Sequence, residues 1–180
     1  MTFSLIRGII GHTEKKEELT MTYIEHAHTF RADCADCFIA LDMDGTIADL
    51  YSCPDWLDRL RHHDPAPYAE ARPLVNLSLL ARLLHKAQAK GYRLAIISWL
   101  SKTSTPDYDE AVTCAKRNWL MRHLPSVQWD EIHIVKYGTP KQSLGIEGFL
   151  VDDEVRNRDA WGEGAVDAVD IIQFLKEIVG

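Results

Sequence analysis

Four short apolar runs are spaced along the chain and separated by longer segments of a different pattern. The runs cover residues 38–41, 94–97, 132–135 and 149–151. Each is apolar, or nearly so, at consecutive positions, which is typical of strands buried on both faces, as in a parallel sheet. We therefore predict four parallel strands at these positions.

The segments between the runs carry apolar residues at helical spacing. Helices are predicted over residues 74–89, where Gly91 provides the usual C-terminal stop, over 108–124, where Pro125 follows, and over 169–178. Strands that alternate with helices form a sheet covered by helices on both faces. The predicted fold class is therefore α/β, a three-layer Rossmann-like parallel sheet, with ligands beyond the carboxyl ends of its strands.

The pattern divides the chain into a leader and one core domain. Residues 1–36 are polar and irregular, whereas residues 37–180 have the length of one ordinary domain. The interval from about residue 50 to residue 73 is interrupted by prolines at positions 54, 65, 67 and 73. We expect it to form a very small, loop-rich cap with one short helix near residues 56–61.

Composition narrows the class of protein. The chain of 180 residues has a formal net charge of −7, which disfavours a protein that coats nucleic acid, because such binding needs many Lys and Arg contacts. No apolar run approaches the roughly 20 residues that span a membrane. Cysteines at positions 34, 37, 53 and 114 do not resemble the disulfide framework of a small secreted domain. We expect a reduced, cytoplasmic protein, in which one or two local cations suffice to bind a small phosphorylated molecule.

Residues capable of chemistry follow each of the four runs. They are Asp42 and Asp44 after the first, Ser98 after the second, Lys136 and Lys141 after the third, and Asp152 and Asp153 after the fourth. Carboxylate oxygens are the ligands that Mg²⁺ prefers, and a phosphoryl group in transfer needs positive charge and hydrogen-bond donors around it. A carboxylate nucleophile can also split hydrolysis into two displacements through an aspartyl-phosphate. The strand ends thus predict a phosphoryl-transfer site.

In order and spacing, these residues resemble the four motifs of the haloacid dehalogenase (HAD) superfamily. The segment FIALDMDGTIADL matches the first motif, LAIIS the second, a lysine the third and FLVDDE the fourth, so the likeness runs from residue 38 to the end. Within the superfamily, DMDGTIADL, AKRNWLMRHL and IHIVKYGTPKQSLGIEGFLVDD are most similar to the 5'(3')-deoxyribonucleotidases. The resemblance implies a HAD-like core, a Mg²⁺ cofactor and hydrolysis of phosphate monoesters.

The resemblance also implies roles for the four aspartates. Asp42 would be the nucleophile and a Mg²⁺ ligand. Asp44 would protonate the leaving group and then activate water, with its backbone carbonyl on the metal. Asp152 would complete the metal site, with Asp153 bound to the ion or beside it.

Further positions follow from the same resemblance. Ser98 would hydrogen-bond the phosphoryl group, and Lys141 fits the spacing of the motif lysine better than Lys136 does. The remaining positions on the substrate side are Gly45, which permits the tight exit turn, Thr46, Trp99 and Lys102. The chain departs from the nucleotidases in its short cap and in Trp99, which stands where they often have a small hydroxyl. Tyr51, Trp56 and Trp99 are either pocket residues that stack on substrate or parts of the core.

Three functions are compatible with these features. The first is a Mg²⁺-dependent phosphomonoesterase that acts on (deoxy)nucleoside monophosphates. The second is a polynucleotide 3'-phosphatase, because a minimal cap suits a strand end, although the net charge of −7 does not. The third is a non-catalytic binding protein with a HAD-like fold, which has no physical need for so many mutually repelling carboxylates. A short cap also makes a homo-oligomer that closes the site an open alternative.

Two hypotheses concern the leader. His26, His28, Cys34 and Cys37 have ligand types that suit a structural zinc, with a plain polar leader as the alternative reading. The segment before Met21 contains Lys-Lys-Glu-Glu, whose purine-rich codons resemble a bacterial ribosome-binding site, so translation starting at Met21 is the second hypothesis.

Overall fold

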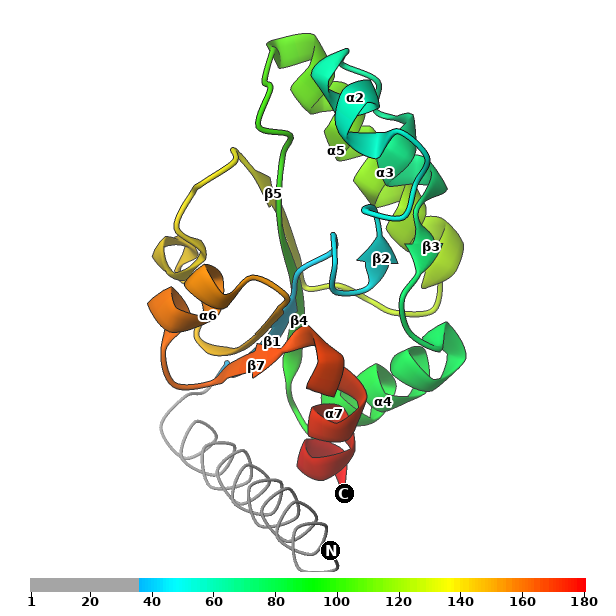
Figure 1. The fold of residues 1–180 in the computed structure, drawn as a ribbon. Helices are drawn as coiled ribbons and strands as arrows, with labels where there is room; N and C mark the ends of the chain where they lie inside the picture. Colours follow the sequence, from blue (N-terminus) through cyan, green and yellow to red (C-terminus); the bar gives the residue numbers. More distant parts are fainter. Residues whose placement is uncertain (1–35) are drawn as a thin grey trace, which may run out of the picture.

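A computed structural model describes residues 36–180, and all structural statements below refer to that part of the chain. Five parallel strands form one sheet in the order β5-β4-β1-β6-β7 (Figure 1). Their bounds are β1 Phe38–Leu41, β4 Arg93–Trp99, β5 Glu131–Val135, β6 Gly148–Asp152 and β7 Ala165–Asp167. The first four contain the four apolar runs, so the predicted strands and the parallel α/β class are confirmed. The predicted leader lies outside the described residues except for its last residue, Asp36, and so do Met21 and the residues at 26, 28 and 34.

The central position of β1 explains why its four residues are all apolar and buried. It pairs in parallel with β4 on one side, where Ala40 faces Ala95, and with β6 on the other, where Ala40 faces Leu150. A strand between two neighbours, with helices on both faces, has no side chain in contact with water. The carboxyl ends of β1, β4 and β6 therefore meet at one edge, which is where the predicted site residues begin.

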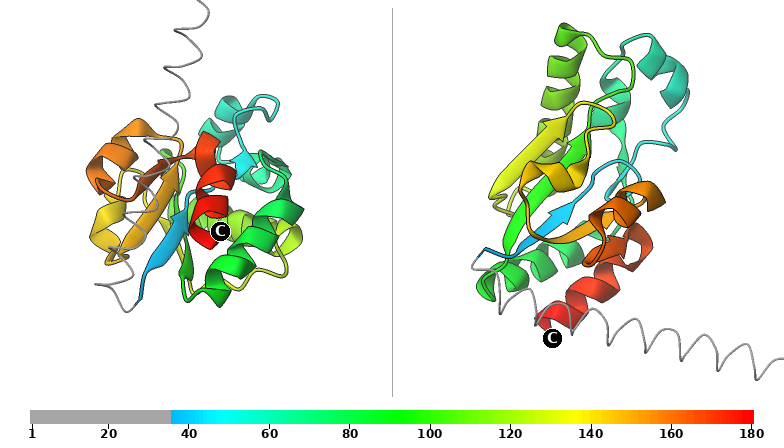
Figure 2. Two further views of the ribbon diagram at one scale, coloured as in Figure 1. Left: turned by 90° about the horizontal axis from the view of Figure 1, so that it is seen from below. Right: turned by 90° about the vertical axis from the view of Figure 1, so that its left-hand side faces the viewer.

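Helices cover the two faces of this sheet unequally (Figures 1 and 2). On one face lie α4 Leu77–Ala89, α5 Pro106–His123 and α7 Ile171–Val179, whose buried side chains form the larger part of the core. The other face carries the 3₁₀ helix η1 Lys141–Leu144 and α6 Val155–Trp161, over a smaller apolar cluster. The three-layer prediction is thus confirmed, and both α6 and β7 are additions to the predicted elements.

Local capping determines where the predicted helices begin. The expected helix over 74–89 starts three residues later, because the side chain of Asn76 accepts the backbone N–H of Leu79. The helix α5 starts at Pro106, behind the cap residue Thr105. The terminal helix α7 follows a short 3₁₀ segment, η2 Ala168–Asp170.

The cap is small but more regular than expected. It holds a two-stranded antiparallel ribbon of β2 Ala48–Asp49 and β3 Arg72–Pro73, with α2 Trp56–Arg61 and α3 Ala66–Glu70 between them. The expectation of a single short helix was wrong, because α3 begins in the proline-rich stretch. Proline is favoured in the first turn of a helix, and Asp64 Oδ1 accepts the N–H of Ala66 there, at 2.9 Å.

The cap is attached to the core chiefly through α5. The helices α3 and α5 pack together, and the indole N–H of Trp119 on α5 donates to the carbonyl of Ala71 at 2.7 Å. Trp119 is itself fully buried. Within residues 36–180 there is no helix that is both long enough and apolar enough to cross a membrane.

Candidate active site

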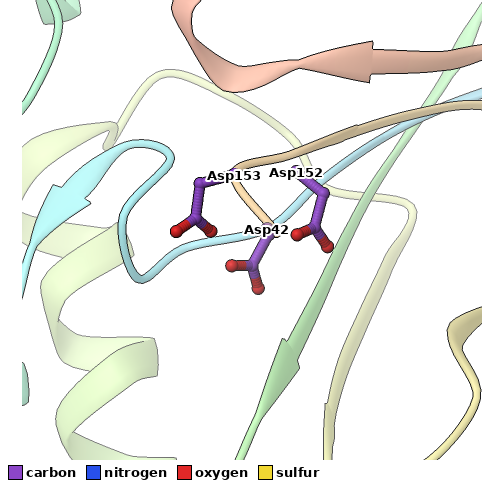
Figure 3. Close-up of side chains that lie close together, drawn as sticks. All are labelled: Asp42, Asp152 and Asp153. Carbon is purple, nitrogen blue, oxygen red and sulfur yellow. The ribbon is translucent and has the colours of Figure 1, made fainter. Parts of the chain in front are cut away.

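Three aspartates converge at the carboxyl ends of the two central strands β1 and β6. Asp42 directly follows β1, Asp152 is the last residue of β6, and Asp153 comes next (Figure 3). One carboxylate oxygen from each lies within 4.8 Å of the others. Parallel pairing of the two strands places these residues together, although they are more than a hundred positions apart in the chain.

The geometry and chemistry of this cluster fit a small divalent cation. Ligand oxygens around Mg²⁺ are separated by about 3 Å when adjacent and about 4 Å when opposite, which the three carboxylates can match. Asp153 Oδ1 is buried without a hydrogen-bond partner in the described part of the protein. Burial, together with the charges of Asp42 and Asp152, raises the pKa of Asp153 to about 7. A bound cation would give Asp153 Oδ1 a partner and would reduce the repulsion between the three carboxylates.

The lysine of η1 lies inside the carboxylate cluster. Lys141 Nζ is 2.9 Å from Asp42 Oδ1 and 2.6 Å from Asp152 Oδ2, and its side chain is 2% exposed. Burial acts to lower the pKa of Lys141, but the two carboxylates outweigh it, so the pKa is raised and the ammonium stays charged. Lys136, in contrast, is exposed. Of the two lysines considered from the sequence, the structure brings Lys141 to the site.

The carboxylate of Asp152 has further donors from α6. Asn157 Nδ2 donates to both of its oxygens, at 3.0 and 3.2 Å, and the backbone N–H of Glu154 donates to Oδ1 at 2.8 Å. Arg158 Nη1 donates to the carbonyls of Asp152 and Asp153. These donors hold the turn after β6 in place. A lone Asn and a lone Arg in an unpredicted helix offered no sequence signal for this role.

Asp44 is paired with a lysine that sequence reasoning missed. Lys116 Nζ, on α5, is 2.5 Å from Asp44 Oδ2, 2.7 Å from Ser98 Oγ and 2.7 Å from the carbonyl oxygen of Trp99. Its position shares the buried face of α5 with Val112 and Trp119, at helical spacing. A lysine at an apolar position of an amphipathic helix was therefore the available signal.

The turn that follows Asp44 depends on Gly45. This residue has φ +78°, and a Cβ atom there would lie 2.3 Å from Asp153 Oδ2. Glycine is thus needed both for the backbone conformation and for the close approach of Asp153. Thr46 is buried, and its hydroxyl has no hydrogen-bond partner within residues 36–180.

A cavity of about 560 Å³ opens above these groups. Its floor includes Asp42, Asp44, Lys141 and Asp153. Its walls carry five aromatic side chains, three from the cap and two from the ends of β4 and β5 or just beyond them: Tyr51, Trp56, Tyr68, Trp99 and Tyr137. The volume lies within the usual range for small-molecule sites, and the aromatic lining is typical of them. Two of the three aromatics considered from sequence as pocket or core residues, Tyr51 and Trp56, contact each other at 5.1 Å between ring centroids.

The remaining predicted positions differ in how they relate to this cavity. Trp99 and Lys102 line it, and the Trp99 indole N–H donates to the carbonyl of Thr139 at 2.9 Å. Ser98 is 0% exposed and is not among the lining residues, since its oxygen accepts from Lys116 instead. Thr46 also lies outside the lining. Direct contact of these two hydroxyls with substrate therefore stays a prediction.

Electrostatics in the site are dominated by crowded carboxylates. Burial raises the pKa of Asp44, against the lowering effect of Lys116. Burial and the neighbouring charge of Asp42 raise the pKa of Asp152, although Lys141 opposes them. Acidic groups with perturbed pKa values cluster in the clefts of functional sites, because catalysis and metal binding use crowded carboxylates.

Comparison with known proteins supports the fold assignment. A solved structure, the D,D-heptose 1,7-bisphosphate phosphatase from Burkholderia thailandensis, superposes with a TM-score of 0.50 and 15% sequence identity, over 78% of this chain and 97% of that chain. No protein-family profile and no curated protein sequence matches the chain. The protein thus shares the α/β fold of that solved structure, and it has a very small cap and an acidic cluster that could hold a metal ion.

Proposed function

We propose that this protein is a Mg²⁺-dependent phosphomonoesterase that works through an aspartyl-phosphate on Asp42. The observation that carries the proposal is the set of charged groups around the carboxylate of Asp42. Lys141 contacts one of its oxygens, the carboxylates of Asp152 and Asp153 lie beside it, and the residue forms part of the cavity floor. These contacts support the proposal, because a carboxylate that could act as nucleophile, an ammonium group and carboxylates that could bind a metal lie together beside a cavity open to a small substrate.

In the first step, a carboxylate oxygen of Asp42 attacks the phosphorus atom of the substrate. A bond forms between that oxygen and phosphorus, and the bond from phosphorus to the leaving-group oxygen breaks. Asp44, which lines the same cavity, gives its proton to the departing oxygen, so the product is a neutral alcohol. Lys141 offers positive charge next to Asp42 as negative charge builds up on the phosphoryl oxygens.

The second step regenerates the enzyme. Asp44, now ionised, takes a proton from a water molecule, whose oxygen attacks the phosphorus of the aspartyl-phosphate. The bond between Asp42 and phosphorus breaks and inorganic phosphate leaves. The residues that would hold Mg²⁺ are Asp42, Asp152 and Asp153, together with the Asp44 carbonyl expected from the sequence. When bound, the ion would neutralise the phosphoryl oxygens and the acidic cluster.

For the substrate, we propose a nucleoside or deoxynucleoside monophosphate. The aromatic walls support this choice, because the flat rings of Tyr51, Trp56 and Tyr137 provide surfaces on which a base can stack. The cavity of about 560 Å³ is large enough for such a molecule. The phosphatase with the similar fold acts, by its name, on a sugar bisphosphate. A sugar phosphate is therefore the substrate to compare with nucleotides.

A polynucleotide 3'-phosphate is the second substrate we consider. The observation in its favour is that two exposed cations, Arg61 on the cap and Lys102 after β4, line the cavity. Neither has an ion-pair partner within residues 36–180. Both could meet the next phosphate along a strand, since phosphate contacts from Lys and Arg dominate such binding.

A phosphate-release screen tests both the reaction and the substrate. It would compare deoxy- and ribonucleoside monophosphates, D,D-heptose 1,7-bisphosphate and a 3'-phosphorylated oligonucleotide, each with Mg²⁺ or with a chelator. We expect Mg²⁺-dependent release, fastest with a nucleoside monophosphate. Fastest release from the oligonucleotide would favour the second substrate instead.

The matched control is Asp42→Asn, which removes the nucleophile but keeps the size of the side chain. We expect it to abolish phosphate release while the far-ultraviolet circular dichroism stays that of the wild type. Phosphate release at the wild-type rate by Asp42→Asn protein would overturn the proposed mechanism.

A further inference from the structure

Lys116, on α5, forms hydrogen bonds with the residues on the side of the site opposite Lys141. It is 0% exposed, although lysine is rarely buried unless it is paired. Its ammonium group has three N–H donors, and the structure uses each one: for Asp44 Oδ2, for Ser98 Oγ and for the carbonyl oxygen of Trp99. Lys116 is therefore fully committed to its protein neighbours and has no donor left for a substrate.

The surroundings of Lys116 leave it little freedom to move. The ring of Tyr68, on the cap helix α3, lies 4.8 Å from Nζ and closes the remaining side. A buried ammonium costs several kcal/mol in lost hydration unless its partners are well placed. Here a carboxylate, a hydroxyl, a carbonyl and an aromatic ring surround it, on three different segments of the chain. The side chain thus acts as a rigid support.

This support acts directly on Asp44. Asp44 stands in the turn after β1, where only an isolated bridge to Ala48 continues the strand, so the backbone alone does little to orient its carboxyl group. The contact with Lys116 fixes Oδ2. No hydrogen bond to Oδ1 is found within residues 36–180, and Asp44 lines the cavity. The free oxygen is therefore the one available to a leaving group.

We propose that Lys116 is a positioning residue for Asp44, and that it holds the carboxyl group in the orientation in which it exchanges protons with the leaving group and with water. Ser98 takes part because its hydroxyl oxygen accepts a hydrogen bond from Lys116. This contact accounts for a buried hydroxyl that does not line the cavity. The proposal rests on the phosphomonoesterase function proposed above and deepens it.

The dependence of the rate on the leaving group tests this role. p-Nitrophenolate is a stable anion and departs without a proton, whereas an alkoxide departs only when it receives one. A residue that acts through Asp44 should matter for the second kind of substrate and much less for the first. General damage to the fold would slow both kinds equally.

We would therefore measure kcat and kcat/KM of Lys116→Met for p-nitrophenyl phosphate and for the best alkyl monophosphate found in the screen. We expect the alkyl substrate to lose on the order of 10²-fold in kcat and the aryl substrate less than about tenfold. The control is Lys136→Met, which removes an exposed lysine elsewhere and should match the wild type on both substrates. Equal losses on the two substrates, or no loss, would overturn the proposal.

A second variant keeps the proposal testable where Lys116→Met does not fold because the partly buried carboxylate of Asp44 has lost its partner. The double variant Asp44→Asn with Lys116→Met removes both charges at once. If Lys116 acts through Asp44, the double variant should release phosphate from the alkyl substrate no more slowly than Asp44→Asn alone. A further drop of tenfold or more would overturn the proposal.

The design also separates this inference from the proposed function. An inactive wild type, with every substrate and with Mg²⁺ present, would overturn the phosphomonoesterase function and the role of Lys116 with it. An active wild type with a Lys116→Met variant that is impaired equally on both substrates would overturn the role of Lys116 alone.

Discussion

Two buried lysines, Lys141 and Lys116, come from opposite faces of the central sheet. Each is paired with a different aspartate of the turn after β1. Lys141, from η1, contacts Asp42 and Asp152. Lys116, from α5, contacts Asp44. Lys141 lies within the acidic cluster and lines the cavity, whereas Lys116 does not line the cavity and donates all its hydrogen bonds to protein groups. Under the proposed function, Lys141 would act on the substrate, and Lys116 would act through Asp44.

This difference shows how one short turn can present two carboxylates to different partners. Side chains two residues apart in a strand point to the same face. Because β1 ends at Leu41, the chain turns between Asp42 and Asp44, and each carboxyl group meets a lysine from its own side of the sheet. Gly45, with its positive φ, then permits the turn that follows Asp44.

The largest difference between the two lysines is expected from Lys141→Met. Because Lys141 contacts the proposed nucleophile itself, its loss should slow phosphate release from alkyl and aryl substrates alike, by about 10²–10³-fold in kcat. The same steady-state assay as for Lys116→Met measures it. A loss confined to the alkyl substrate would mean that the two lysines do not differ in the proposed way.

A smaller effect is expected from Gly45→Ala. The added Cβ would lie 2.3 Å from Asp153 Oδ2, and the residue would also have to adopt φ +78°. Asp153 must move away, so we expect weaker Mg²⁺ activation, together with a loss of unfolding free energy of roughly 1–3 kcal/mol. A Mg²⁺ titration of activity and a urea unfolding curve measure the two effects. Gly138→Ala is the matched control, since it also has a positive φ but open space around it.

The smallest effect concerns stability without metal. The pKa of Asp153 is raised from 3.8 to about 7, so the folded state binds a proton more tightly than the unfolded state does. The contribution of Asp153 to the free energy of unfolding is therefore most favourable below about pH 4 and becomes unfavourable as the pH rises to about 7. In the presence of a chelator, Asp153→Asn should unfold with a free energy roughly 1–3 kcal/mol above that of the wild type at pH 8, and close to it near pH 4.

Magnesium should reverse this order. At pH 8, Mg²⁺ should raise the thermal unfolding temperature of the wild type more than that of Asp153→Asn, because an ion bound only by the folded state adds to its stability. Equal shifts for the two proteins would place the metal away from Asp153.

Much of the fold could be read from the sequence because buried parallel strands are apolar at consecutive positions. Phe38–Leu41 was predicted to the residue, and β4, β5 and β6 to within two residues at either end. The exceptions have local causes. The helix α3 begins among prolines, a pattern that predicts a loop, and β7 holds three residues, of which Val166 alone is fully buried. Signals this short do not stand out from a loop.

By itself, the sequence determined which residues stand at the ends of the central strands, and hence that carboxylates and a lysine would gather at one edge. Hydrophobic periodicity suffices for this, because it is a local property. Only the tertiary structure decided which charges meet. Lys116 reaches Asp44 across 72 positions, and Ser98 turned out to support that lysine instead of lining the cavity. Pairs of buried charges depend on how elements distant in sequence pack together, and no local pattern contains that information.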